Sequence, residues 1–171
     1  MNSDIVSGLV KKNQNELIYS LVRSHKPMLK LSQITFLLLG SALTVMGIMY
    51  LCTTEFMPYH SEAIQLEWSE LNPDYQGLFL GFLRGLGAGA LTSGVAIVFM
   101  AVRMIRGRIQ PYLFLLPAVS IGYLTLLCFA TYTVYARTPA NPPLVLVLVL
   151  LGCANVASLF LWLGWRARND S

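Results

Sequence analysis

The sequence carries little charge. Only 12% of its 171 residues are charged, whereas an ordinary soluble domain carries about 25%. Hydrophobic residues make up 56% of the chain, and the mean hydropathy is +0.61. Because so few charges cannot cover a soluble surface, we expect much of the surface to face lipid. The length allows one domain.

Cysteine is also scarce, and catalytic motifs are absent. Cys52, Cys128 and Cys153 are far apart and show no CxxC or Cys/His spacing, which excludes a typical zinc site or disulfide framework. Residues 1–30 contain no apolar core of signal-peptide length, so the first apolar run is expected to remain as a membrane anchor. Neither an enzyme nor a nucleic-acid partner is indicated.

Long apolar runs dominate the rest of the chain. A membrane-spanning helix needs about 20 mostly apolar residues. Four runs meet this length, at 31–52, 77–102, 112–136 and 144–165. Within them only the second run carries a charge, at Arg84. The sequence therefore predicts an all-α membrane protein, with a cytoplasmic arm at 1–30 and a four-helix transmembrane domain at 31–171.

The basic residues give this topology a direction. Leaving out Arg84, ten Lys and Arg residues flank one side of the predicted spans: Lys11, Lys12, Arg23, Lys26, Lys30, Arg103, Arg106, Arg108, Arg166 and Arg168. On the other side there is only Arg137. Basic residues favour the cytoplasmic side. We therefore expect both termini and the middle link on the cytoplasmic side, and the two outer links on the periplasmic side or the cell exterior.

The N-terminal arm has a helical apolar pattern. Ile5, Val6, Leu9 and Val10 form a stripe that recurs in phase over residues 17–22. Positive charge comes from a separate set of residues: Lys11, Lys12, Arg23 and Lys26. This pattern favours a helix that lies on the anionic leaflet or docks on a partner, the alternative being a solvated leader. Pro27 is expected to end this helix.

The link between the first two spans is predicted to be a structured cap. Ser61 is expected to start a short helix over residues 62–70. Asn72, Pro73 and Asp74 then form a strong start signal for the next helix: a capping side chain, a proline at the first position and an acid at the positive helix end.

Glycines recur every four residues along the second span. Gly77, Gly81, Gly85 and Gly89 share one helix face, which permits close approach of another helix backbone. Packing inside the bundle is one interpretation. The alternatives are contact with another subunit and a ligand held against the bare backbone.

Arg84 lies inside this glycine run, about 10 Å from Gly77 along a helix. A charge within the membrane usually has a partner or a water path. Its side chain is expected to bind an anion or lipid headgroup, to reach the interface, or to pair with an acid of the link. The candidate acids are Glu62, Glu67 and Glu70.

Further polar residues fall at similar depths in the other spans. Asn155 is expected to join two helices, and the two span cysteines to act as small buried hydrophobes. Tyr132 and Asn155, with Arg84 and His60, complete the set of candidate ligand-binding residues. His60 follows Pro58 and Tyr59, where a capping role competes with ligand binding. No metal ligand set accompanies it.

One segment resembles a known group of proteins. It contains Met57-Pro-Tyr-His60, then Trp68, Leu71, Gln76 and Arg84-Gly-Leu-Gly-Ala-Gly89. In these residues, about a third of the chain, it resembles small four-span bacterial membrane proteins of the DUF4345/DoxX-like kind. The resemblance implies a compact four-helix bundle with a small outer helix after the first span, and an association with quinone-linked redox complexes.

Two functional hypotheses follow. The first is a non-enzymatic accessory or assembly subunit of a larger inner-membrane complex, in contact with the lipid bilayer and with other membrane subunits. The second is a module that binds a lipid, a quinone or a small anion near Arg84. A transporter is disfavoured, since there is one intramembrane charge and no pair of broken helices.

Overall fold

The computed structural model describes residues 3–169, with side chains described from Pro27 to Asn169. This part of the chain is built from helices. In chain order they are α1 (Ser3–Cys52), α2 (Pro58–Ile64), the 3-10 turn η1 (Trp68–Glu70), α3 (Pro73–Ile105), the 3-10 turn η2 (Gln110–Tyr112), α4 (Leu115–Arg137) and α5 (Leu144–Asn169).

Four helical segments are long and apolar enough to cross a membrane. They are Pro27–Cys52, Pro73–Ile105, Gln110–Arg137 and Leu144–Asn169, and each contains one predicted span. The prediction of four helices long and apolar enough to span a membrane is therefore confirmed, and these segments extend up to four residues beyond the predicted runs. Large apolar side chains cover the outside of the bundle, as lipid contact requires.

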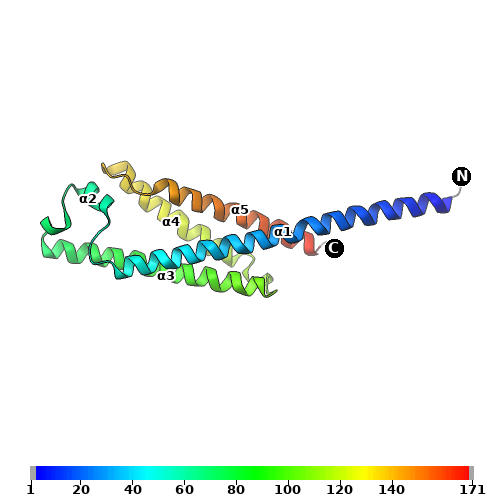
Figure 1. Cartoon of the computed structure of the whole chain (residues 1–171), viewed down its shortest axis with the longest axis horizontal. Helices are drawn as coiled ribbons and strands as arrows, with labels where there is room; N and C mark the ends of the chain where they lie inside the picture. Colours follow the sequence, from blue (N-terminus) through cyan, green and yellow to red (C-terminus); the bar gives the residue numbers. More distant parts are fainter. Residues whose placement is uncertain (1–2, 170–171) are drawn as a thin grey trace.

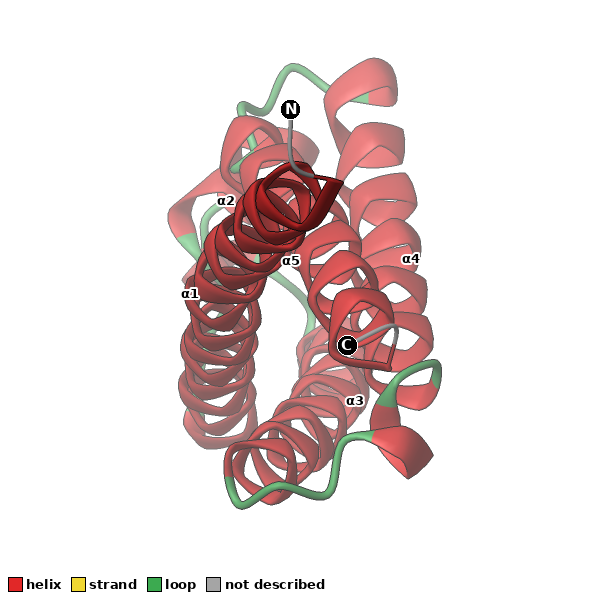
Figure 2. Cartoon of the chain, turned by 90° about the vertical axis from the view of Figure 1, so that its right-hand side faces the viewer, coloured by secondary structure: helices red, strands yellow, loops and turns green. Residues whose placement is uncertain are grey.

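The spans form an antiparallel bundle (Figures 1 and 2). Around the bundle the order is α3, α1, α5 and α4. α1 packs extensively on α3 and α5, whereas α3 and α4 have the smallest contact among neighbouring spans. We call the end near Cys52, Arg137 and Leu144 the α2 end. The opposite end, near Lys30 and Ile105, is the arginine end.

Glycine brings α1 and α3 into backbone contact. A Cβ atom added to Gly94 would lie 2.5 Å from the backbone nitrogen of Thr44 and 2.8 Å from the Gly40 oxygen. One added to Gly87 would lie 2.9 Å from the Gly47 oxygen. Since lipid offers helices no hydrophobic gain on association, this close packing is a main attraction between the two helices.

One polar contact ties α1 to α5. The buried Ser32 hydroxyl donates a hydrogen bond to the Ala157 carbonyl, over 2.7 Å. Next to it lies the main core, in which Phe36, Leu116 and Leu161 are fully buried. With Ile97 and Ala101 of α3, which are also fully buried, the core joins all four spans.

Pro27 does not end a helix. α1 runs without a break from Ser3 to Cys52, and its first half projects beyond the bundle (Figure 1). The predicted stop at Pro27 is therefore wrong. A proline removes one backbone N–H, a loss that a long helix can absorb. The predicted docking residues lie outside the side chains that the structure describes: Lys11, Lys12, Arg23 and Lys26.

The start of α3 follows the prediction. Pro73 is its first residue, and the Asn72 side chain accepts a hydrogen bond from the Asp74 N–H at 2.9 Å. The short helix before it differs, because α2 starts at Pro58 and Ser61 lies inside it. The predicted Ser61 cap is therefore wrong. A proline that fits the first helical turn sets the start instead.

Candidate functional site

The contact between α1 and α3 fixes the level of Arg84. An added Cβ on Gly87 would lie 2.9 Å from the Tyr50 Cβ and 3.0 Å from the Leu51 nitrogen, and α1 ends at Cys52. The helices are antiparallel, so Arg84, three residues before Gly87, lies level with the last turn of α1. Figure 1 shows α3 projecting past the other spans at this end. Arg84 therefore lies at the end of the contact between α1 and α3, and its predicted depth in the membrane stays a prediction.

Arg84 is exposed at this edge. Its side chain has no hydrogen bond or ion pair with the residues between Pro27 and Asn169. The predicted acidic partners are engaged elsewhere. Glu62 accepts a hydrogen bond from the Asn141 N–H at 3.4 Å, and Glu70 accepts one from the Glu67 N–H at 2.9 Å. The described structure therefore gives no support to a salt bridge between Arg84 and the link.

His60 caps the start of α2. Its Nδ1 accepts a hydrogen bond from the Met57 N–H at 3.0 Å. The ring is half-buried, with its centroid 4.1 Å from that of Tyr59 and 6.1 Å from that of Phe56. Burial disfavours the charged ring and lowers the pKa of His60. A neutral ring is what the cap needs, because protonated Nδ1 is not an acceptor.

The other two candidate ligand-binding residues lie on separate helices. Tyr132 is exposed on α4, and Asn155 is exposed on α5. The Asn155 amide donates to the Leu151 carbonyl of its own helix at 2.8 Å, so Asn155 does not join two helices within the described chain. No hydrogen bond, ion pair or ring contact in the described residues joins any two of Arg84, His60, Tyr132 and Asn155.

The cysteines are less buried than predicted. Cys128 is half-buried, and Cys153 is exposed on the surface of α5. The prediction of a small buried hydrophobe is therefore wrong for Cys153. Depth along a span does not reveal which side of the helix faces lipid.

Most of the predicted glycine row faces open space. A Cβ added to Gly77, Gly81 or Gly85 would meet nothing within 4 Å, and one on Gly89 would make an ordinary 3.6 Å contact with Tyr123. Packing inside the described chain therefore does not use the first three glycines. Their contact with another subunit stays a prediction.

Aromatic side chains hold the link against the projecting part of α3. The Phe56 ring lies edge-on to Trp68 at 4.9 Å and to Phe79 at 5.8 Å. The Gln76 side chain donates to the carbonyls of Trp68 and Leu71, at 2.8 and 3.2 Å. The link is therefore an ordered cap, although sequence reasoning did not identify Phe56 as its centre.

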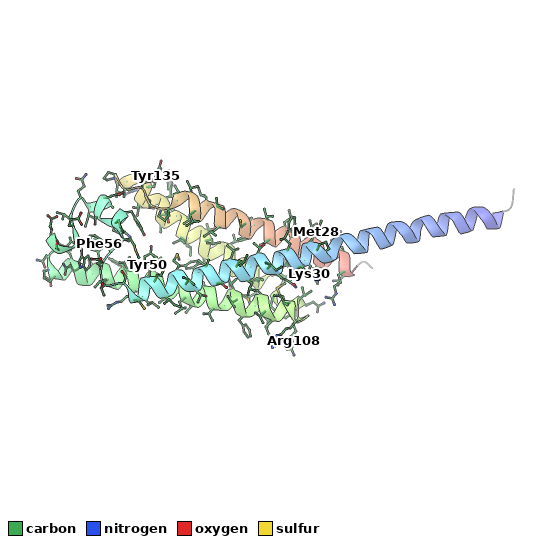
Figure 3. All side chains as sticks on the ribbon, in the orientation of Figure 1. Met28, Lys30, Tyr50, Phe56, Arg108 and Tyr135 are labelled. Atoms are coloured by element: carbon green, nitrogen blue, oxygen red, sulfur yellow. The ribbon has the colours of Figure 1, made fainter. Side chains whose placement is uncertain are left out.

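A tyrosine pair joins this cap to α1. The hydroxyl groups of Tyr50 and Tyr59 are 2.8 Å apart. Burial, followed by this hydrogen bond, raises the pKa of Tyr59 above its ordinary value. Figure 3 shows Tyr50 and Phe56 at the α2 end, and Lys30 and Arg108 at the arginine end.

The two ends differ in charge. At the α2 end, a cavity of about 520 Å³ has four acids in its wall: Glu55, Glu62, Glu67 and Glu70. At the arginine end, a cavity of about 350 Å³ is lined by Arg108 and Arg168. Between Pro27 and Asn169, no three His, Cys, Asp or Glu side chains are grouped to hold a metal ion.

Comparison of the chain with protein-family models, curated proteins and solved structures found no significant match. The resemblance to DUF4345/DoxX-like proteins stays a prediction.

Proposed function

We propose that the chain is a non-enzymatic accessory or assembly subunit of a larger bacterial inner-membrane complex. The arginine end and both termini face the cytoplasm in this proposal, and the α2 end faces outward. One observation carries it. The projecting part of α3 exposes an apolar surface that the described chain leaves uncovered. This α3 patch consists of Tyr75, Gly77, Leu78, Gly81, Phe82 and Gly85.

The patch is continuous on the helix surface. Leu78 lies three and four residues from Gly81 and Phe82, which makes these residues neighbours on an α-helix. Tyr75, Leu78 and Phe82 are 59%, 53% and 67% exposed. Much of the patch lies beyond the end of α1, where the bundle's other spans do not extend. Apolar side chains alone can face lipid, but an apolar surface that also carries a row of small residues is typical of contacts between membrane helices.

The glycines give the patch a shape that suits a helix. In the same chain, Gly87 and Gly94 already bring α3 into backbone contact with α1. Gly77, Gly81 and Gly85 offer the same bare backbone on a free side of α3. A helix of another subunit is therefore the partner that fits this patch.

A bulky residue in the patch tests this proposal. Gly81→Leu meets open space, so the fold is expected to survive, with an unchanged circular dichroism spectrum and a melting temperature no lower than that of the wild-type chain. The matched control is Gly122→Leu on α4, where an added Cβ also meets nothing within 4 Å. Each chain is purified from its host in a gentle detergent, and the stoichiometry of co-purifying membrane proteins is measured.

We expect the wild-type chain and Gly122→Leu to retain a stoichiometric partner that Gly81→Leu loses. A wild-type chain that is monodisperse and alone would contradict the proposal. So would a Gly81→Leu chain that keeps its partner.

A second candidate function is a module that binds a lipid, a quinone or a small anion. The unpartnered guanidinium of Arg84 at the α2 end favours it, because an arginine binds an anionic group through two parallel hydrogen bonds. Arg84→Ala and Arg137→Ala are compared by native mass spectrometry, since Arg137 is exposed at the same end. Loss of a bound anion only in Arg84→Ala supports this function, and equal retention in both excludes it.

A further inference from the structure

Two segments of the chain form the wall of the cavity at the arginine end. One side comes from the loop after α3 and the other from the end of α5. Its lining residues are Gly107, Arg108, Ile109, Gln110, Pro111, Trp165, Arg168 and Asn169. None of them is acidic. The volume, about 350 Å³, falls within the usual range for small-molecule sites.

The loop side of the cavity is set by the way α3 ends. Gly107 has a φ of +93°, a conformation that glycine adopts without strain. Its N–H donates to the Met104 carbonyl at 3.0 Å, and the Arg108 N–H donates to the Arg103 carbonyl at 3.1 Å. This pair of bonds is the Schellman arrangement. It turns the chain sharply and places Arg108 in the cavity wall.

The next residues anchor the loop. Ile109 is 5% exposed and belongs to the main hydrophobic core, together with Leu113. The Tyr112 N–H donates to the Ile109 carbonyl at 3.0 Å, which closes the turn η2. The backbone of Arg108 is therefore fixed by hydrogen bonds before it and by a buried residue after it. The loop backbone loses little conformational entropy when a ligand binds.

Between Pro27 and Asn169, the charged side chains at this end of the bundle are basic. Besides the two arginines in the cavity wall, they include Lys30, Arg103 and Arg106. The acidic side chains of the same residues lie at the other end, in the link and in the first turn of α3: Glu55, Glu62, Glu67, Glu70 and Asp74. The described part of the cavity wall therefore favours an anion. The Arg108 side chain has no hydrogen bond or ion pair with the described residues.

The location of the cavity indicates which class of anion it binds. The cavity opens where the spans end, and Trp165 forms part of its wall. Tryptophan at a span end is typical of the headgroup layer of a membrane. The anions concentrated in that layer are the phosphate groups of acidic phospholipids. A guanidinium matches a phosphate group through two parallel hydrogen bonds.

We propose that this cavity binds the phosphate headgroup of an anionic phospholipid, with Arg108 as its principal ligand. The site is independent of the α3 patch and lies at the opposite end of the bundle. Arginines at a span end also set membrane orientation without binding any particular lipid. The experiment must therefore distinguish lipid binding in this cavity from the general effect of basic residues at a span end.

The chain supplies a matched control. Arg106 is two residues from Arg108, is exposed, and does not line the cavity. Arg106→Gln and Arg108→Gln remove the same charge from the same end. All variants of the full chain also carry Trp68→Phe and Trp162→Phe, so that Trp165 is the one tryptophan. They are placed in phosphatidylcholine nanodiscs that contain an increasing fraction of phosphatidylglycerol. The fluorescence emission of Trp165 measures lipid binding at the cavity.

We expect a saturable change in Trp165 emission as phosphatidylglycerol increases. Arg108→Gln should weaken the apparent affinity about tenfold more than Arg106→Gln, as loss of hydrogen bonds to a charged group predicts. Arg108→Lys keeps the charge and the orientation but loses the paired hydrogen bonds, so it should weaken binding by a smaller factor. It serves as the second variant if Arg108→Gln does not fold.

Three results would overturn the proposal. The first is an emission change that does not saturate. The second is an equal effect of Arg106→Gln and Arg108→Gln, which would reduce both arginines to general positive charge. The third is the same emission change when inorganic phosphate is added to pure phosphatidylcholine nanodiscs, which would assign the site to a soluble anion.

Discussion

Replacement of Gly94 by alanine should weaken the contact between α1 and α3. The added Cβ would lie 2.5 Å from the Thr44 nitrogen and 2.6 Å from its Oγ1. The Thr44 hydroxyl also donates to the Gly40 carbonyl at 2.8 Å, so neither group can turn away freely. The helices must then separate by about 1 Å, and overpacking of this kind costs about 1–3 kcal/mol.

Gly81→Ala is the matched variant, because its Cβ meets nothing within 4 Å on the same helix. Both substitutions gain about the same helix propensity, roughly 1 kcal/mol, and this gain cancels in the comparison. The difference between the two free energies of unfolding isolates the steric clash. We expect Gly94→Ala to be about 2 kcal/mol less stable than Gly81→Ala.

The assay is unfolding in mixed micelles with an increasing fraction of dodecyl sulfate, followed by circular dichroism. The two variants are compared with each other and with the wild-type chain. If Gly94→Ala proves as stable as Gly81→Ala, the backbone contact between α1 and α3 does not hold the bundle together. The level assigned to Arg84 would then lose its basis.

Three further predictions concern the α2 end. Asn72→Ala removes the cap that accepts from the Asp74 N–H, so the unfolding free energy in micelles should fall by about 1 kcal/mol. Tyr59→Phe removes the hydrogen bond to Tyr50 and should cost about 1 kcal/mol in the same assay. The lowered pKa of His60 makes the unfolded link bind protons more readily than the folded link. The stability of α2 should therefore be complete above the ordinary histidine pKa of about 6.5 and fall as the pH drops through the folded value, with emission of Trp68 as the readout.

Each of these predictions has its own control. Asn141→Ala should leave stability unchanged, because Asn141 donates to Glu62 through its backbone N–H and the substitution keeps that group. Tyr135 is exposed on the surface of α4. Tyr135→Phe should therefore leave the free energy of unfolding unchanged, whereas Tyr59→Phe lowers it. The pH dependence should vanish in His60→Gln and persist when the chain's other histidine is replaced, in His25→Gln. A pH dependence that survives His60→Gln would exclude the capping histidine as its source.

The spans were predictable because they depend on length and composition alone. A run of about 20 apolar residues can satisfy its backbone only as a helix in lipid, so hydropathy identifies it directly. The start of α3 was predictable for a different reason. The Asn72 cap and Pro73 act within one turn of the helix, and no distant contact is needed to place them.

The glycine contacts show where periodicity stops being informative. A spacing of four along α3 predicted a packed face, yet Gly77, Gly81 and Gly85 are open. The glycines that meet α1 are Gly87 and Gly94, seven residues apart, and a spacing of seven also returns to one face of a helix. A glycine spacing of four and one of seven both indicate a helix face on which another helix can pack closely. Neither spacing predicts whether that helix belongs to the same chain.

Local hydrogen bonds account for two of the candidate ligand-binding residues. His60 accepts from the Met57 N–H, and Asn155 donates to the Leu151 carbonyl, so both bonds lie within one turn of the residue itself. A polar residue in or beside a helix always has backbone groups of this kind within reach. Its presence in an apolar segment is therefore weak evidence for a ligand or for a neighbouring helix.

The position of Arg84 follows only when two kinds of information are combined. Apolar residues continue through Leu78 and Leu83, so hydropathy alone places the membrane edge near Gly77 and buries the arginine. The register against α1 adds that α3, at 33 residues and about 50 Å, extends about eleven residues beyond the end of α1. Arg84 therefore lies where α1 no longer covers α3. The apolar surface beyond Arg84 is the α3 patch, and under the proposed function a helix of another subunit covers it.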